Sequence, residues 1–308
     1  MSYFMSTIHT IMMRAQAAHI AVPGFNIPYL PMMEPVARAL CDARCFGLIM
    51  VARLEWEKFA AGGVQPVYET YQQVKDERFM RLHLDHVPVI DEDNLPVDYE
   101  DILTEAATLG YDSIMVDGSR LSLDDNIAAT RRIVDMAHAR DVAVEAELGA
   151  VMGHESGPMP PYEELFASGQ GFTDPDEARR FVSETKVDWL SVAIGSVHGA
   201  ISETARRAKK PAARLSIERL DALREATGIP LVLHGGTGIP KEYILESVQH
   251  GIAKINIATA IRQPYEALMA EDESAALQAV YDATMTVIRD DLELLHSVDI
   301  LNPGGAQA

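Results

Sequence analysis

Three histidines, His86, His198 and His234, each follow a short apolar run of the kind that forms a buried strand. Three neutral imidazoles that leave a fourth coordination position open are a ligand set typical of catalytic zinc. One histidine alone is more often a hydrogen-bonded structural residue, but three at the ends of strands predict a metal site. In the motif His-Leu-Asp-His, spacing leaves open whether His83 or His86 is the ligand, because side chains alternate along a strand.

A glycine-rich turn follows the third of these histidines, in the segment Val-Leu-His-Gly-Gly-Thr-Gly at 232–238. Glycines let the backbone approach an anion closely, and backbone N–H groups then face its oxygens. The segment Ile-Asn-Ile-Ala-Thr at 255–259 offers a second set of such donors. If these segments end the last two strands of a barrel, they lie where barrel enzymes often bind phosphate. The sequence therefore predicts a phosphate site there.

The elements that must position these residues alternate regularly along the chain. Eight short runs rich in valine, isoleucine, leucine and methionine are predicted strands: 22–27, 47–52, 80–87, 113–117, 142–148, 189–195, 231–234 and 253–257. Helical periodicity fills the intervals, for example at 123–140, 174–185, 217–227 and 241–249, and a further long helix is predicted at 275–295. This alternation predicts an α/β fold, a (β/α)8 TIM barrel with additional C-terminal helices; a doubly wound open sheet is the alternative.

Polar residues at the ends of most predicted strands favour the barrel over the open sheet. They are Asn26, Asp85, His86, Asp117, Glu147, His198, His234 and Asn256. In a barrel all these ends converge on one face, whereas an open sheet gathers its ligands at a switch point between two strands. Since no linker or low-complexity segment divides the sequence, we expect one domain over residues 1–308.

The formal net charge of −20 constrains the partners of the chain. It opposes a non-specific grip on nucleic acid, and an anionic substrate would need local positive potential from a metal or from backbone N–H groups. No apolar run is long enough to cross a bilayer, and the first sixteen residues lack the features of a signal peptide. Cys41 and Cys45 are the only cysteines, and we expect reduced thiols, which predicts a cytoplasmic protein.

Eight motifs, in order within residues 12–262, resemble the class II, zinc-dependent fructose-bisphosphate and tagatose-bisphosphate aldolases. They are Gly-Phe-Asn (24–26), His-Leu-Asp-His (83–86), Val-Asp-Gly-Ser (116–119), Val-Glu-Ala-Glu-Leu-Gly (144–149), Phe-Thr-Asp-Pro (172–175), Ala-Ile-Gly-Ser-Val-His-Gly (193–199), Leu-Val-Leu-His-Gly-Gly-Thr-Gly (231–238) and Lys-Ile-Asn-Ile-Ala-Thr (254–259). The resemblance implies a class II aldolase-like barrel that acts on a phosphorylated sugar. It also implies one catalytic Zn2+ per subunit, room for a monovalent cation, and a homodimer or homotetramer.

The resemblance assigns roles position by position. His86, His198 and His234 match the zinc ligands, and Glu147 matches a glutamate beside the metal. Asp85 matches the catalytic acid/base, and Glu155 matches the glutamate that exchanges the C3 proton. The matches to substrate and phosphate contacts are Asn26, Gly199, Gly235, Thr237, Asn256, Ala258 and Thr259. For Asp85 and Glu147 a second reading stays open, in which they only orient a ligand histidine.

These roles together describe a retro-aldol cleavage between C3 and C4 of a ketose. A metal ion at the C2 oxygen would serve as Lewis acid for the enediolate that forms when the bond breaks. Asp85 would take the proton of the C4 hydroxyl, and Glu155 would protonate the enediolate carbon. The products would be dihydroxyacetone phosphate and an aldehyde.

The chain departs from the family where bisphosphate aldolases bind the far end of their substrate. The run Met-Val-Ala-Arg at 50–53 replaces a common Gln-x-Ser contact, and the usual distal-phosphate arginine has no clear counterpart. The segment 205–214 is longer and more basic than usual. We therefore expect a phosphorylated ketose whose distal group is not phosphate. Arg53 and the basic cluster at 206–210 are the candidates to receive a different acidic group.

Three other functions compete with a metal-dependent aldolase. A Schiff-base aldolase would need a desolvated lysine, and Lys254, predicted at the wrong end of its strand, is the candidate. A catalytically impaired barrel could bind a sugar phosphate or serve as a subunit of an aldolase complex. A metal-dependent epimerase or hydrolase would use similar ligands.

Overall fold

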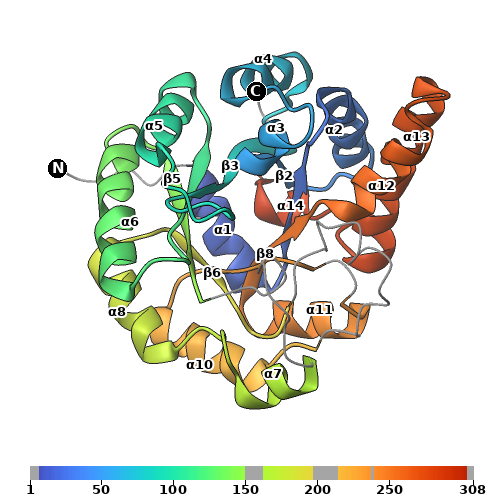
Figure 1. Ribbon diagram of the computed structural model, residues 1–308. Helices are drawn as coiled ribbons and strands as arrows, with labels where there is room; N and C mark the ends of the chain where they lie inside the picture. Colours follow the sequence, from blue (N-terminus) through green and yellow to red (C-terminus); the bar gives the residue numbers. More distant parts are fainter. Residues whose placement is uncertain (1–6, 150–161, 197–213, 237–238, 304–308) are drawn as a thin grey trace.

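The computed structural model describes residues 7–149, 162–196, 214–236 and 239–303, and eight parallel strands close into one barrel (Figure 1). The strands are β1 (Val22–Asn26), β2 (Gly47–Ala52), β3 (Met80–Pro88), β4 (Ser113–Asp117), β5 (Ala143–Leu148), β6 (Trp189–Val192), β7 (Leu231–Leu233) and β8 (Ile252–Ile257). Each strand pairs with its neighbours in the sequence, and β8 pairs with β1. The predicted TIM barrel is therefore confirmed, and the open sheet is excluded.

Helices before, between and after the strands surround the barrel (Figure 1). They are α1 (Thr7–Ala18), α2 (Met33–Asp42), α3 (Arg53–Glu57), α4 (Val64–Val74), α5 (Tyr99–Leu109), α6 (Leu123–His138), α7 (Tyr162–Ser168), α8 (Pro175–Thr185), α10 (Ile217–Thr227), α11 (Lys241–Gln249), α12 (Thr259–Leu268), α13 (Glu273–Thr286) and α14 (Val298–Leu301), with short helical turns η1 (Leu30–Met32) and η2 (Val287–Asp291). Among these described helices, none combines the length and apolar character that crossing a bilayer requires.

Two helix predictions agree fully with the structure, and one is wrong in extent. The helices α10 and α11 begin and end at the predicted residues. The long helix predicted at 275–295 ends as an α-helix at Thr286, and a π-helical turn continues to Asp291. Sequence periodicity near 3.6 cannot distinguish the wider π turn from one more turn of α-helix.

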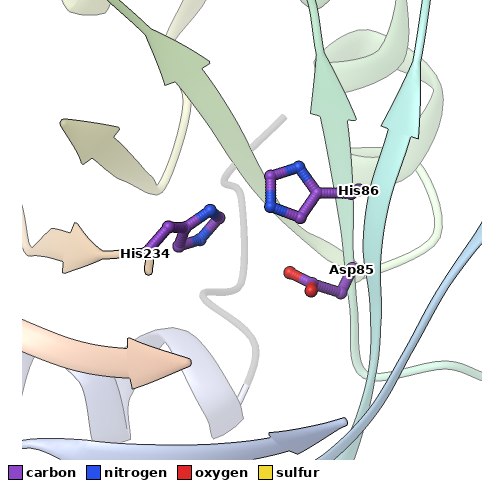
Figure 2. Close-up of side chains that lie close together, drawn as sticks. All are labelled: Asp85, His86 and His234. Carbon is purple, nitrogen blue, oxygen red and sulfur yellow. The ribbon is translucent and has the colours of Figure 1, made fainter. Parts of the chain in front are cut away.

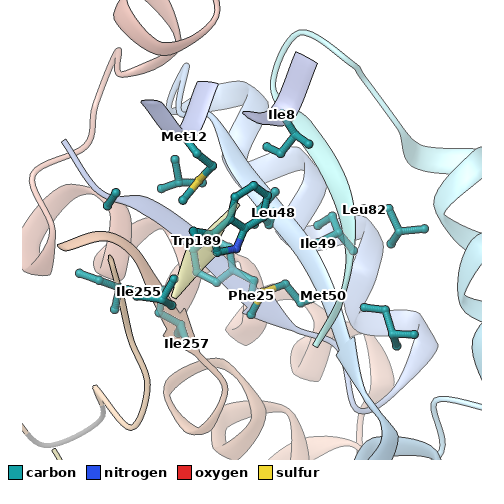
Figure 3. Close-up of a cluster of buried hydrophobic side chains, with 14 of the residues drawn as sticks. Ile8, Met12, Phe25, Leu48, Ile49, Met50, Leu82, Trp189, Ile255 and Ile257 are labelled. Atoms are coloured by element: carbon teal, nitrogen blue, oxygen red, sulfur yellow. The ribbon is translucent and has the colours of Figure 1, made fainter. Parts of the chain in front are cut away.

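The N-terminal helix α1 covers the end of the barrel where the strands begin. Its residues Ile8 and Met12 are buried in the same cluster as Trp189 and Leu48 (Figure 3). At the start of β6, the carboxylate of Asp188 lies 2.7 Å from Nδ1 of His9 on α1. Because this end is covered, chemistry that needs access from solvent belongs at the opposite end, where the strands finish.

Candidate active site

A bulge in β3 brings two consecutive side chains to the same place. Strand register shifts between Leu84 and Val87, so β3 contains one residue more than β4 over this stretch. At the bulge the backbone of His86 has a φ of +26°, outside the usual strand region. Regular alternation would turn Asp85 and His86 to opposite faces, but here both point toward His234 (Figure 2).

The imidazole rings of His86 and His234 meet at the mouth of the barrel. Their centroids are 4.5 Å apart, and the ring planes are inclined at 67°. Nδ1 of His86 lies 3.1 Å from Asp117 Oδ2, and Nε2 of His234 lies 2.9 Å from Glu145 Oε1. These carboxylates hold one nitrogen of each ring, so metal coordination would use Nε2 of His86 and Nδ1 of His234.

The donor atoms around these rings suit a divalent metal ion. One ligand atom each from Asp85, His86 and His234 can be chosen so that all lie within 4.8 Å of one another. Glu147, buried on β5, places Oε2 3.3 Å from His234 Nδ1 and 3.8 Å from His86 Nδ1. Imidazole nitrogens together with carboxylate oxygens are the usual ligands of catalytic zinc. The predicted ligands that the structure describes, His86, His234 and Glu147, therefore fit a metal site.

The carboxylate of Asp85 is held between two amides. Nδ2 of Asn26 donates to Oδ2 over 3.0 Å, and Nδ2 of Asn256 donates to Oδ1 over 2.9 Å. Burial alone would raise the pKa of Asp85, but the positive charges of His86 and Lys254 lower it to about 2. Asp85 is therefore a fixed, ionised carboxylate beside the histidines. Asn26 and Asn256, predicted as substrate contacts, orient this group.

The barrel interior also contains a buried ion pair, next to Asp85 and His234. Nζ of Lys254 lies 2.8 Å from Oε2 of Glu145 and donates to Oδ1 of Asn256 over 2.7 Å. Nε1 of Trp189 also donates to Oε2 of Glu145, over 2.6 Å. Neither charged side chain is exposed to solvent. The lysine and the indole together hold the carboxylate that contacts His234.

The expected position of Lys254 needs a correction. Its backbone lies in the first half of β8, as predicted, but its long side chain reaches along the barrel interior to within 3.9 Å of Asp85 Oδ1. Distance from the site therefore does not exclude it as a Schiff-base lysine. Its ion pair with Glu145 does argue against that role, because the nucleophile must be an uncharged amine.

His83 and His86 have different neighbours, so the structure distinguishes the two histidines that spacing along the strand could not. Nδ1 of His83 lies 2.8 Å from Ser113 Oγ, and its Nε2 lies 3.5 Å from Glu145 Oε2. Burial lowers the pKa of His83 to about 3, so this ring is neutral. A metal-capable group with two imidazoles forms around His86 and His234, whereas His83 groups with Asp85 and Glu145.

Two functional candidates received no role in the sequence analysis. Asp117 and Glu145 each hold a nitrogen of one of the two histidines at the barrel mouth. A signal for Glu145 was present, because Val-Glu-Ala-Glu places residues 145 and 147 on one face of a strand. The sequence shows Asp117 only as a polar strand end, because its pairing with His86 depends on the bulge in β3.

The predicted phosphate site is described in part. Gly235 follows β7 with a φ of +69°, a conformation that favours glycine, while Ala258 and Thr259 form the junction between β8 and α12. Because β7 and β8 are paired, these two junctions are neighbours at the barrel mouth. The other predicted site residues, Glu155, His198, Gly199, Thr237 and the basic cluster at 206–210, lie outside the described residues.

The structure is a closed parallel (β/α)8 barrel, and the imidazoles and carboxylates at the carboxyl ends of its strands form a candidate metal site. The sequence matches the family described as fructose-bisphosphate aldolase class-II over residues 6–299. The chain therefore belongs to the class II fructose-bisphosphate aldolase family.

Individual relatives agree with this assignment. A 6-phospho-5-dehydro-2-deoxy-D-gluconate aldolase from Halalkalibacterium halodurans is 32% identical over 295 residues, which cover 94% of this chain and 88% of the relative. The YdjI aldolase from Escherichia coli K12 superposes with a TM-score of 0.73 at 25% identity, covering 96% of this chain and all of that one. A candidate fructose-1,6-biphosphate aldolase from Coccidioides immitis gives 0.73 at 26% identity, covering 94% and 96% of the two chains.

Proposed function

We propose that this protein is a zinc-dependent aldolase that reversibly cleaves the C3–C4 bond of a phosphorylated ketose to dihydroxyacetone phosphate and an aldehyde. The observation that carries the proposal is an ionised Asp85, held by two amides, next to the imidazoles of His86 and His234. An aldol cleavage needs a proton acceptor and an electrophile at one place, and this group of residues supplies the acceptor and the ligands for the electrophile.

The metal ligands in this proposal are His86, His198, His234 and Glu147, for one zinc ion per subunit. Bound there, the ion would supply Lewis acidity to the ketose carbonyl. The contacts of Asp117 and Glu145 with one nitrogen of each described histidine ring support this assignment, because such contacts orient ligand histidines. His198, outside the described residues, is assigned by family resemblance.

Two carboxyl groups transfer protons in this proposal. Asp85 accepts the proton of the C4 hydroxyl as the C3–C4 bond breaks, and it returns this proton during synthesis. The low pKa of Asp85 keeps it ionised at neutral pH, which is the form that can accept a proton. Glu155, assigned by resemblance, delivers a proton to C3 of the dihydroxyacetone phosphate fragment.

In this proposal the backbone at the junctions after β7 and β8 binds the phosphate. Gly235, Thr237, Ala258 and Thr259 would provide N–H groups and a hydroxyl, and Gly199 a further backbone contact. Asn26 and Asn256 would touch the substrate next to Asp85, which they already hold. With a net charge of −20, the protein attracts an anionic substrate only through such local donors and the metal.

The distal end of the substrate is proposed to carry no phosphate. The compound in the name of the Halalkalibacterium halodurans relative, 6-phospho-5-dehydro-2-deoxy-D-gluconate, has a phosphate beside its ketone and a carboxylate at the other end. Such a compound is a ketose phosphate of the kind that the altered contacts at 50–53 predict. We propose a substrate of this class.

The proposals for assembly and location rest on the cysteines and on the family resemblance. Burial raises the pKa of the Cys41 thiol to about 11 and that of the Cys45 thiol to about 12, which disfavours their oxidation to a disulfide. Reduced thiols support a cytoplasmic protein. The family resemblance supports a homodimer or homotetramer.

The test is Asp85→Asn, which keeps the size of the side chain and removes its basicity. We expect turnover of a ketose-phosphate panel to fall at least about 100-fold while bound zinc stays at the wild-type amount. Dihydroxyacetone phosphate release and metal analysis are the measurements. Wild-type turnover in Asp85→Asn would refute the acid/base role, and a wild-type protein that cleaves fructose 1,6-bisphosphate fastest would refute the proposed distal group.

A further inference from the structure

Arg53 is positioned next to the reacting end of the barrel. It follows directly on Ala52, the last residue of β2, which is paired in register with Asp85 on β3. Helix α3 begins at Arg53 and lies beside the ends of β2 and β3 (Figure 1). Its side chain is only 20% exposed. A long cationic side chain at the carboxyl end of a strand usually extends into solvent instead.

The guanidinium of Arg53 has acidic neighbours but no close acceptor among the described residues. Oε1 of Glu57 is 3.5 Å away and Oδ2 of Asp91 is 4.0 Å away, and neither contact has hydrogen-bond geometry. Asp91 directs its Oδ1 to its own loop, where it accepts from the backbone N–H groups of Asp93 and Leu95. A half-enclosed guanidinium therefore keeps its planar set of donors available.

Two other cations near this part of the barrel, both among the described residues, already have partners. Lys254 pairs with Glu145 and donates to Asn256. Arg262 on α12 donates to Glu266 and lies over the ring of Phe59, 5.1 Å from its centroid. Of these three cations, Arg53 is the one that can receive an anionic group without breaking a hydrogen bond to another described residue.

We infer that Arg53 binds the terminal carboxylate of the substrate, an inference that rests on the proposed aldolase function. A carboxylate matches the fork of a guanidinium with two parallel hydrogen bonds. Glu57 and Asp91 make this position unfavourable for a doubly charged phosphate, because each adds a repulsive charge that a monoanion feels less. The same three residues thus select for a carboxylate and against a distal phosphate.

The test uses the synthetic direction, in which dihydroxyacetone phosphate is joined to aldehydes that differ only at the distal end. Malonic semialdehyde is compared with propanal, and succinic semialdehyde with butanal. For the wild type we expect the aldehyde acid of at least one pair to give a kcat/KM about 30-fold or more above its uncharged partner. Arg53→Ala should abolish this preference by raising KM for the aldehyde acid, with KM for dihydroxyacetone phosphate and kcat/KM for propanal and butanal within about threefold of wild type.

Two further variants sharpen the result. Arg53→Lys should recover part of the preference, because a lysine keeps the charge and loses the planar fork. Arg38→Ala is the matched control, since Arg38 is a 44%-exposed arginine on α2 whose ion pair with Glu34 lies on the outer surface. It should keep the wild-type preference.

The outcomes separate the inference from the function on which it rests. Equal losses with charged and uncharged aldehydes in Arg53→Ala would show a structural role and overturn the inference. The inference would also be overturned if the wild-type protein joined dihydroxyacetone phosphate to butanal but showed no preference for either aldehyde acid. The aldolase function would then stand. Wild-type protein that consumes dihydroxyacetone phosphate with none of the aldehydes would overturn both.

Discussion

At the scale of single residues, the site depends on carboxylates that hold histidine nitrogens. Asp117 holds Nδ1 of His86, and Glu145 holds Nε2 of His234, so each ring turns its other nitrogen toward the proposed metal. Ring orientation of this kind raises metal affinity, because the ligand has no rotamer freedom left to lose. Burial would raise the pKa of Asp117, but the hydrogen bond and charge of His86 lower it, so Asp117 is an ionised partner.

The prediction at this scale is that Asp117→Asn weakens zinc binding about 10- to 100-fold, because an amide holds the His86 ring less firmly than a carboxylate does. Zinc affinity is measured by competition with a chromophoric chelator, and the thermal midpoint of the zinc-free variant is compared with that of wild type. Asp93→Asn, on an exposed loop, is the control and should bind zinc normally. Unchanged zinc affinity in Asp117→Asn would contradict the role of His86 as a ligand.

At the scale of elements, the sequence predicts the strands well but not the irregularity that builds the site. The alternation of apolar residues locates β3, yet the extra residue at Asp85 and His86 leaves no mark in that pattern. This is why spacing could not decide between His83 and His86. In β5, by contrast, Glu145 and Glu147 point inward as regular alternation requires. The sequence does not show which residues on other strands they contact, and the structure does.

Helix α3 contains a buried titratable group beside the site. Oε2 of Glu55 accepts from the backbone N–H of Ala52 and from Nδ2 of Asn26, at 2.8 and 3.4 Å. Burial raises the pKa of Glu55 to about 8, whereas an unfolded glutamate titrates near ~4.3. At a pH between these two pKa values, Glu55 is protonated in the folded chain and ionised in the unfolded chain. The free energy of unfolding contributed by Glu55 therefore falls as pH rises through this window.

We predict that Glu55→Gln removes this decline. The glutamine keeps an acceptor for Ala52 and cannot ionise, so its stability relative to wild type should increase by up to about 1.4 kcal/mol per pH unit between pH 5 and pH 8. Urea denaturation of both proteins at several pH values measures the difference. Glu57→Gln, on the exposed side of the same helix, should keep the wild-type pH dependence. A constant difference between Glu55→Gln and wild type would contradict a protonated Glu55.

At the scale of the whole molecule, one end of the barrel provides stability and the other provides chemistry. Helix α1 covers the starting ends of the strands, where Asp188 joins three elements. Its carboxylate lies 2.7 Å from His9 on α1 and 2.8 Å from His138 on α6, and it accepts from the backbone N–H of Val144 on β5 over 2.7 Å. At the opposite end, we propose, the polar residues bind a metal and a substrate.

Asp188→Ala should therefore destabilise the protein by about 3 kcal/mol, because it leaves a buried backbone N–H and two histidines without their acceptor. Denaturant unfolding at pH 7 measures the loss. Asp124→Ala is the control, since Asp124 is 76% exposed and pairs with Arg180 on the surface; it should cost less than about 1 kcal/mol. Equal effects of the two substitutions would contradict a structural role for the covered end.

The fold as a whole could be predicted from eight repeats of strand and helix, because a closed barrel is the arrangement that brings so many polar strand ends together. The sequence also located Asp85, His86, His234 and Glu147, which the structure gathers at one mouth. It could not reveal the reach of Lys254 along the interior, because the path of a long side chain depends on partners from other strands. Nor could it tell that the guanidinium of Arg53 has no close acceptor within the part of the chain that the structure describes.

The most direct test is the metal dependence of aldol cleavage. Dihydroxyacetone phosphate release from a carboxylate-ended ketose phosphate is measured before and after removal of metal by a chelator, and again after addition of zinc. Borohydride is added to substrate and protein in a parallel sample. We predict that the chelator abolishes turnover, zinc restores it, and borohydride traps no adduct. Full turnover in the chelator, with substrate covalently trapped on Lys254, would contradict a metal site built by His86 and His234.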